Sequence, residues 1–472
     1  MASKGLQMNG IVLKDMLGRI AERGRGFVEK RSLRLAAFAA RGPASKVGSE
    51  RIEDLCRALL SGRGEASGVA LASKVLDRYA AMSNQEKTDF FHVLAKDFGP
   101  DPQRLKQAWA TYEQASDAAG LRELLIAVEP PRQELFRRLN LAPGGTSALV
   151  ALREDLINLG GKDPDLACVE DDLVHLFYSW FNRGFLVMQR ITWSTPADVL
   201  ERIIRYEAVH SIKGWDDLRS RLQPPDRRCY AFFHPSLIDE PLIFVEVALT
   251  SGIPGSIQDI LAEDRAILLP EQATTAVFYS ISNCQTGLKG VSFGNFLIKQ
   301  VAQDISRDVP SLKNFVTLSP APGFAHWLKR VAADPKAVGL ANFDPAALAP
   351  LQTKDWHLDP ALRSALRPII LDLAAFYYVR AKTPSGKPID PVARFHLGNG
   401  ARLERLNWLG DTSPKGLREA EGLMVNYLYD LRFIEQNHEA FANSGTVVAS
   451  DPIKSHLLAF APDLIFSENR HV

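Results

Sequence analysis

The segment from Thr275 to Pro320 constrains the fold more than any other part of the chain. It reads TAVFYSIS, then the glycine-rich turn NCQTGLKGVSFG, then FGNFLIKQVAQDISRDV with apolar residues at helical spacing, and finally NFVTLSP. The first and last stretches are rich in β-branched and aromatic residues, which is typical of strands. The order strand, turn, helix, strand predicts a mixed α/β domain, with the turn at the carboxyl end of a strand, where such domains bind ligands.

The turn itself contains three glycines and a lysine, Gly287, Lys289, Gly290 and Gly294. Residues without a Cβ let backbone N–H groups converge on phosphate oxygens, and the dipole of the following helix adds positive potential. The spacing matches neither GxGxxG nor GxxxxGK[ST], so neither a dinucleotide site nor a P-loop is predicted. Two interpretations stay open here: an anion cradle, or a turn that only connects a strand to a helix.

The first 190 residues show helical periodicity. Stretches such as TSALVALREDLINLG (146–160) and EDDLVHLFYSWFNRGFLVMQRI (170–191) carry apolar residues at helical spacing between turns rich in glycine and proline. Nothing in this region resembles a catalytic constellation. The pattern predicts an all-helical domain over residues 1–190, and amphipathic helices of this kind favour packing or self-association.

After residue 190 the pattern changes to strands mixed with helices. CYAFFHP (229–235) and PLIFVEVALT (241–250) are predicted to pair as a hairpin across SLIDE. Further helices are predicted at 362–381 and 416–431. Residues 191–472 therefore form the predicted mixed α/β domain, and the fold class of the whole chain is α+β, helical first and mixed afterwards.

Charge and composition exclude several classes of partner. The chain of 472 residues has 56 Lys and Arg against 55 Asp and Glu, a net charge of +1, whereas nucleic-acid binding requires a concentrated basic excess. No stretch has the roughly 18 uninterrupted apolar residues of a membrane span. No His, Cys and carboxylate residues cluster at metal-ligand spacing. We predict a bacterial cytoplasmic protein, in preference to one of the mitochondrial matrix.

Part of the glycine turn resembles the pyrophosphate loop of the GCN5-related N-acetyltransferases (GNAT), written Q/RxxGxG/A. Gln285 and Gly290 are in register with that motif, whereas Leu288 replaces its first glycine. The resemblance implies a fold that binds acyl-CoA.

Longer stretches carry a more specific resemblance. YSISNCQTGLKGVSFGNFLIKQV (279–301), NFVTLSPAPGFAHWL (314–328) and ARFHLGNGARLERLNWLGDTSPKGLREAEGLMVNYLYDL (393–431), in this order, closely resemble the malonyl-CoA decarboxylase family. The similarity covers most of residues 185–440. It implies a helical oligomerisation domain that makes a dimer or tetramer, followed by a GNAT-like catalytic domain that converts malonyl-CoA to acetyl-CoA and CO2.

The resemblance also implies the site residues. The catalytic serine and histidine of the family fall on Ser319 and His396, and its CoA-binding segment falls on the turn and the start of the helix, Lys289 to Asn295. From the physics of the turn we add Gln285 and Gly287. A purely structural alternative exists for both catalytic residues, because Ser319 opens a proline-rich turn and His396 is a lone histidine between apolar neighbours. The predicted substrate-binding residues are Gln285, Gly287, Lys289, Gly290, Val291, Ser292, Phe293, Gly294 and Asn295.

The implied reaction requires little from the protein. Loss of CO2 leaves charge on C2 of the acyl group, and the adjacent thioester delocalises it as an enolate, so no external cofactor or metal is expected. Histidine suits a proton donor because its ordinary pKa of about 6.5 lies near working pH. We expect His396 to protonate C2 or polarise the thioester, and Ser319 to bind either the substrate carboxylate or His396.

Two other functions remain compatible with the sequence. An acyltransferase of the same fold would require an acceptor amine or thiol, and is favoured only by the acetyltransferase-like turn. A non-enzymatic acyl-CoA sensor would use the helical half as its interaction surface and would bind CoA without turnover.

Overall fold

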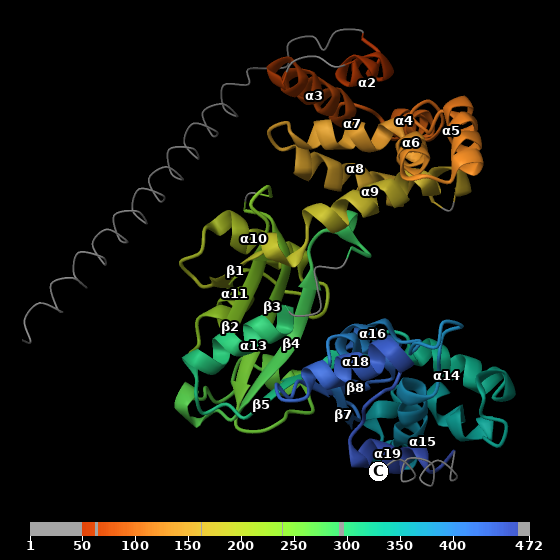
Figure 1. Cartoon of the computed structure of the whole chain (residues 1–472). Helices are drawn as coiled ribbons and strands as arrows, with labels where there is room; N and C mark the ends of the chain where they lie inside the picture. The colour runs from red at the N-terminus through yellow and green to blue at the C-terminus, as the bar shows by residue number, and fades with distance from the viewer. Residues whose placement is uncertain (1–49, 62–64, 162, 238, 292–296, 461–472) are drawn as a thin grey trace, which may run out of the picture. The chain divides into compact units, whose positions relative to one another are not determined.

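The computed structural model describes residues 50–61, 65–161, 163–237, 239–291 and 297–460 (Figure 1). Contacts within the chain divide it into two compact units, Met1–Ser83 and Asn84–Val472. In the first unit, α2 (Ile52–Leu60) packs against α3 (Glu65–Ala80). The domain boundary expected at residue 190 stays a prediction.

The second unit begins with helices that bury apolar side chains. They are α4 (Asn84–Lys96), α5 (Pro102–Ala115), α6 (Ala118–Val128), α7 (Pro131–Asn140), α8 (Gly145–Leu159) and α9 (Ala167–Trp180). The predicted helix is wrong beyond Trp180, because Val187–Ile191 form strand β1 and pair with the next strand of the sheet. Within the described ranges, none of the helices combines the length and apolar character that a bilayer-spanning helix requires.

An eight-stranded sheet follows, with strand order β1-β2-β3-β4-β5-β8-β6 and with β7 paired to β8. The remaining strands are β2 (Arg227–Phe233), β3 (Pro241–Thr250), β4 (Thr275–Asn283), β5 (Asn314–Thr317), β6 (Ser319–Pro320), β7 (Arg402–Asn407) and β8 (Met424–Leu428). The predicted β2–β3 hairpin is confirmed. The order β4, turn, α13 (Leu297–Asp308), β5 is also confirmed, and β4 and β5 are parallel.

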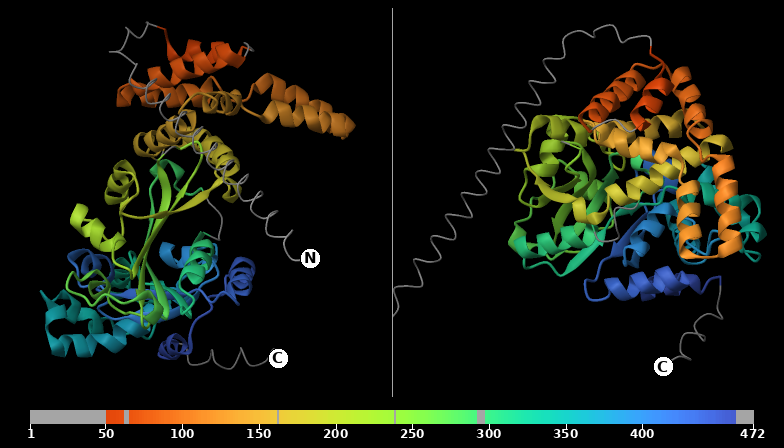
Figure 2. Two further views of the ribbon diagram at one scale, coloured as in Figure 1. Left: turned by 90° about the vertical axis from the view of Figure 1, so that its left-hand side faces the viewer. Right: turned by 45° about the horizontal axis from the view of Figure 1, so that its top comes forward.

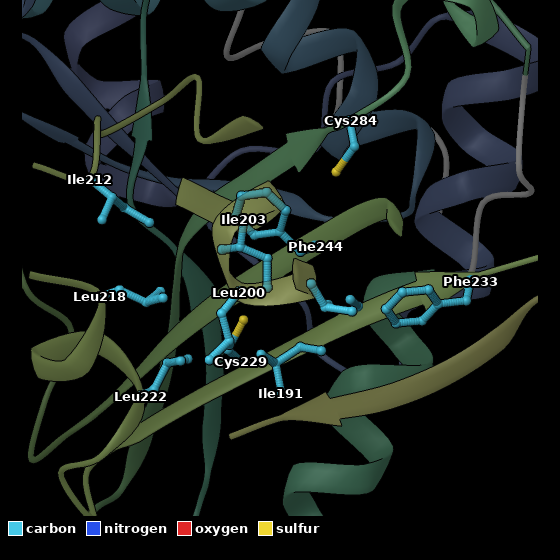
Figure 3. Packing of buried hydrophobic residues seen from close by; sticks show 12 residues of the cluster. Ile191, Leu200, Ile203, Ile212, Leu218, Leu222, Cys229, Phe233, Phe244 and Cys284 are labelled. Atoms are coloured by element: carbon cyan, nitrogen blue, oxygen red, sulfur yellow. The ribbon is translucent and has the colours of Figure 1, made fainter. Parts of the chain in front are cut away.

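One face of the sheet is covered by α10 (Ala197–Tyr206) and α11 (Trp215–Leu222). Their apolar side chains, among them Leu200, Ile203 and Leu218, pack with Cys229 of β2 and Phe244 of β3 into a buried core (Figure 3). A second core on neighbouring strands includes Tyr279 of β4 and Leu318. These cores fix the strands that carry the site described below.

The chain after β6 forms helices around β7 and β8 (Figures 1 and 2). They are α14 (Phe324–Ala333), α15 (Pro360–Val379), α16 (Pro391–Gly398), α17 (Pro414–Ala420), α18 (Ile434–Ser444) and α19 (Asp451–Leu457). The helix predicted at 416–431 is therefore wrong in its second half. Gly422 has a φ of 79°, a left-handed conformation that ends a helix, and the β-prone residues after it become β8, with strands on both sides.

Candidate active site

The fold brings Ser319 and His396 together although 77 residues separate them. The Ser319 Oγ lies 3.1 Å from the His396 Nε2, and the two residues are only 6% and 3% exposed. Ser319 begins β6, and His396 lies near the end of α16. The start of α16 is fixed by Asp390, whose carboxylate accepts the Ala393 N–H at 2.8 Å, so the helix presents its histidine from a capped, rigid element.

The hydrogen bonds around this pair define the tautomer of His396. The Ser319 hydroxyl donates to the Thr317 Oγ1 at 2.9 Å. A serine has only one proton to donate, so the His396 Nε2–H must donate to Ser319. The Nδ1 atom then carries the lone pair, which accepts from the Tyr429 hydroxyl at 2.8 Å. The result is a directed chain, Tyr429 to His396 to Ser319 to Thr317.

The surroundings keep His396 neutral. The Tyr427 ring stacks on the imidazole, with centroids 4.6 Å apart and planes 28° apart. Burial lowers the pKa of His396 from 6.5 to about 3, since the charged ring would lose its hydration. Burial also raises the pKa of Tyr429 well above its ordinary value, so this phenol keeps its proton. The expectation of a histidine that titrates near neutral pH does not hold for this environment.

Three residues of this cluster were not singled out from the sequence: Thr317, Tyr427 and Tyr429. Thr317 ends β5 and Ser319 begins β6, two residues later, so the two side chains point to the same side of the extended chain. Its Oγ1 also accepts the Tyr427 N–H at 3.2 Å, which ties the end of β5 to β8. The segment MVNYLYD does contain the alternation of a strand, and reading it so would have placed Tyr427 and Tyr429 on one face.

The glycine turn closes on itself in the part that the structure describes. The N–H groups of Leu288, Lys289 and Val291 each donate, at 3.0 Å, to the carbonyls of Gln285, Thr286 and Leu288 respectively. These N–H groups are therefore occupied within the turn and do not point freely at a ligand. The predicted binding residues Ser292, Phe293, Gly294 and Asn295 lie outside the described residues.

Two predicted binding residues of the turn have contacts inside the protein. A Cβ on Gly287 would overlap the Val150 carbonyl of α8, and the Gly287 carbonyl accepts from Arg153 at 2.8 Å. Gly287 is thus required for close packing against α8. The Gln285 side chain donates to the Pro241 carbonyl at 3.2 Å.

Lys289 and Gly290, in contrast, are exposed. Gly290 has a φ of 82°, and a Cβ there would meet no heavy atom within 4 Å. Its carbonyl accepts from the Tyr178 hydroxyl at 3.0 Å. This side of the turn can therefore be approached by a ligand.

A strand edge connects the turn to the Ser319–His396 pair. The parallel pairing of β4 with β5 ends at Phe278 and Thr317, with one further bond from the Leu318 N–H to the Phe278 carbonyl at 3.0 Å. Beyond this point β4 continues to Asn283, and none of the other described strands pairs with that edge. At about 3.3 Å per residue, the edge is roughly 16 Å long and leads to the glycine turn.

Sequence comparisons identify related proteins. The family model "Malonyl-CoA decarboxylase C-terminal domain" matches residues 184–464, and "Malonyl-CoA decarboxylase N-terminal domain" matches residues 98–181. The protein named "Malonyl-CoA decarboxylase, mitochondrial" from Anser anser anser is 36% identical over 410 residues, which cover 80% of this chain and 81% of that protein.

Comparison with solved structures finds proteins of the same name. The crystal structure of malonyl-CoA decarboxylase from Rhodopseudomonas palustris has 56% sequence identity and a TM-score of 0.83, covering 86% of this chain and 98% of that one. That from Agrobacterium vitis has 54% identity and a TM-score of 0.82, with 86% and 99% covered. From the matched models and these relatives, we conclude that the chain belongs to the malonyl-CoA decarboxylase family.

Proposed function

We propose that this protein converts malonyl-CoA to acetyl-CoA and CO2 at the Ser319–His396 pair. The bond between C2 and the carboxylate carbon breaks, its electron pair forms the thioester enolate, CO2 leaves, and C2 then takes up one proton from a solvent water molecule, whose hydroxide the solvent neutralises. Family membership supports the reaction. The observation that supports the site is the buried hydrogen bond between the Ser319 Oγ and the His396 Nε2 at 3.1 Å.

The tautomer of His396 favours one of its two expected roles. Protonation of C2 by a neutral imidazole would leave an imidazolate, which is a poor product in a buried site. A neutral Nε2–H can instead donate a hydrogen bond to the developing enolate oxygen, and a preorganised donor of this kind stabilises the transition state. We therefore assign to His396 the polarisation of the thioester, with Tyr429 holding its ring in the required tautomer.

Ser319 can then act on the substrate through its hydroxyl. In the unliganded chain its proton is directed at Thr317 and its lone pair accepts from His396. A bound thioester that takes over the His396 Nε2–H frees the Ser319 oxygen from this donor, and the hydroxyl can rotate towards the substrate carboxylate. The burial of both side chains excludes water, which strengthens each of these contacts.

For the CoA portion, we propose the exposed side of the turn and the edge of β4. Lys289 and Gly290 would face the pyrophosphate, together with Ser292, Phe293, Gly294 and Asn295. The predicted binding residue Val291 is only 5% exposed, and we assign it to the support of the turn. The backbone of β4 beyond Phe278, with which none of the other described strands pairs on this edge, would suit the two amides of the pantetheine arm, which can bind as an additional strand would. Gln285 and Gly287 have partners inside the protein, and we assign them to the support of the turn.

A direct assay tests the reaction. Purified protein is incubated with malonyl-CoA labelled in the carboxylate, without added cofactor, amine or thiol. We expect labelled CO2 and acetyl-CoA in equal amounts, and much slower release from methylmalonyl-CoA or free malonate. Acetyl-CoA that appears only after an acceptor is added, or intact transfer of the malonyl group, would instead identify an acyltransferase.

We also propose that the helical region mediates self-association into a dimer or tetramer. Trp109 of α5 is 55% exposed and Leu125 of α6 is 64% exposed, and large apolar side chains on a helix surface favour a protein partner. Analytical ultracentrifugation of Leu125→Glu should show a shift towards monomer, whereas an unchanged mass would place the interface elsewhere. The cytoplasmic location stays a prediction.

A further inference from the structure

A small cavity lies against the turn that follows Ser319. Pro320, Ala321 and Pro322 form one wall, and Ala420 of α17 and His210 contribute others. Successive side chains of a strand point to opposite faces, so Pro320 faces away from the side on which Ser319 meets His396. Only about 10 Å³ is free for the centre of a water-sized molecule, which is the lower limit for one small occupant.

His210 is held rigidly at this cavity. The Glu207 carboxylate accepts the N–H groups of Val209 and His210 at 2.7 and 2.8 Å, and Arg221 donates to the His210 carbonyl at 2.9 Å. The Nε2 atom of His210 is nevertheless buried without a hydrogen-bond partner in the described part of the chain. A buried polar atom of this kind carries a cost unless a ligand or water fills the space beside it.

The other ionisable side chains around the cavity are already engaged. Lys415 donates to the carbonyls of Ala208 and Val209 at 2.7 and 3.2 Å. The remaining two are Asp411, which accepts from Gln258 and the Ser413 N–H, and Glu419, which accepts from Arg418. The unsatisfied atom is therefore the His210 Nε2.

The chemistry of the walls selects a neutral occupant. Burial lowers the pKa of His210 from 6.5 to about 4, so its ring is neutral at physiological pH. Asp411 and Glu419 add negative charge to the lining, the ammonium group of Lys415 already donates to two backbone carbonyls, and the proline and alanine walls offer no donor. An anionic carboxylate would be repelled here and left without hydrogen bonds. In the tautomer that carries its lone pair on Nε2, the neutral ring suits a small uncharged molecule with an electron-poor centre.

We propose that this cavity receives the CO2 that is cleaved from the substrate, an inference that rests on the proposed function. The carboxylate starts on the Ser319 side, becomes neutral as the C2–carboxylate bond breaks, and is then accepted by a site that its charged form could not enter. The cavity is next to the reacting pair along the chain, because Pro320, which lines it, directly follows Ser319. Removing CO2 from the enolate prevents the two from recombining.

Filling the cavity tests this proposal. Ala420 is 2% exposed, and Ala420→Leu places a larger side chain in the space. The matched control is Ala127→Leu in α6, at an alanine that is 3% exposed and lines no part of the cavity. We expect Ala420→Leu to lower kcat about tenfold with little change in KM. The ¹³C isotope effect at the carboxylate carbon should fall towards unity, since trapped CO2 recombines before it escapes.

The outcomes are separable. A ¹³C isotope effect in Ala420→Leu that equals the wild-type value overturns the proposal. This holds whether or not the kcat of Ala420→Leu falls together with that of Ala127→Leu. A crystal of the wild-type protein under CO2 pressure gives an independent readout that needs no variant: CO2 density beside the His210 Nε2 supports the proposal, and a retained water overturns it. Failure of the wild-type protein to release CO2 from malonyl-CoA would contradict the proposed function itself.

Discussion

His396 is buried and His210 is partly buried, and both have lowered pKa values, about 3 and about 4, yet their surroundings differ. Both ring nitrogens of His396 have side-chain partners, Ser319 and Tyr429. The Nε2 of His210 has none among the described residues. Burial alone therefore says that a histidine is neutral, whereas its partners decide which nitrogen carries the proton and what the ring can do.

The strongest test of this difference is to replace each ring by an amide. His396→Asn should lower turnover at least a hundredfold, because it removes the donor aimed at the thioester oxygen. The affinity for CoA should be unchanged, since His396 does not contact the proposed pyrophosphate site. The equivalent change His210→Asn should cost about tenfold or less. Steady-state kinetics of both variants measure this, and equal losses would remove the distinction between the two rings.

Ser319→Ala should also lower turnover by about a hundredfold. Because Ser319 and His396 act as one unit, the double variant should be about as slow as the slower single variant. Single-turnover kinetics of the two single variants and the double variant give the coupling free energy between the two side chains. Additive losses would mean that the two side chains work independently. If Ser319→Ala lowers the free energy of unfolding by as much as it raises the activation free energy, Ser319 has a structural role.

Tyr429→Phe should reduce kcat about tenfold, because the His396 Nδ1 loses its donor and the ring is no longer held in one tautomer. The neighbouring Tyr427→Phe is the matched control. Its hydroxyl is buried without a hydrogen-bond partner in the described residues, so its loss should leave kcat within about twofold. A comparison of kcat and KM for both variants is sufficient, and a loss as large for Tyr427→Phe as for Tyr429→Phe would refute the role of Tyr429.

Both histidines should make the fold less stable in acid. Their folded pKa values lie below the unfolded value of 6.5, so the unfolded chain binds more protons as the pH falls below 6.5. Each histidine therefore removes up to about 1.4 kcal/mol of unfolding free energy per pH unit in that range. Urea unfolding of His396→Asn between pH 6.5 and 5 should show a shallower slope than wild type, and identical slopes would contradict a neutral, buried His396.

Much of the sheet could be predicted from the sequence because its central strands are uninterrupted apolar runs. The segments that became β2, β3, β4 and β5 carry that signal directly. The segments that form β1 and β8 were predicted as the ends of helices, because VMQRI and MVNYL lie a few residues after helical patterns. Short apolar runs fit either structure until their strand partners are known.

The site was predictable only in part. Ser319 and His396 were identified through the resemblance to the malonyl-CoA decarboxylase family, and local spacing alone would not have paired them. Thr317, Tyr427 and Tyr429 join the site through strand pairing between distant segments, which no local pattern encodes. The place of His210 could not be predicted for the same reason, since its cavity is formed by segments that are far apart in the chain.

The protonation state of His396 is the most direct test of the account. Nitrogen NMR of protein labelled with ¹⁵N only in histidine distinguishes the Nε2–H tautomer, the Nδ1–H tautomer and the imidazolium by their chemical shifts. We predict a neutral Nε2–H ring at pH 7 that does not titrate down to about pH 5. A charged ring at pH 7, or a proton on Nδ1, would contradict the directed chain from Tyr429 to Thr317 on which the proposed mechanism depends.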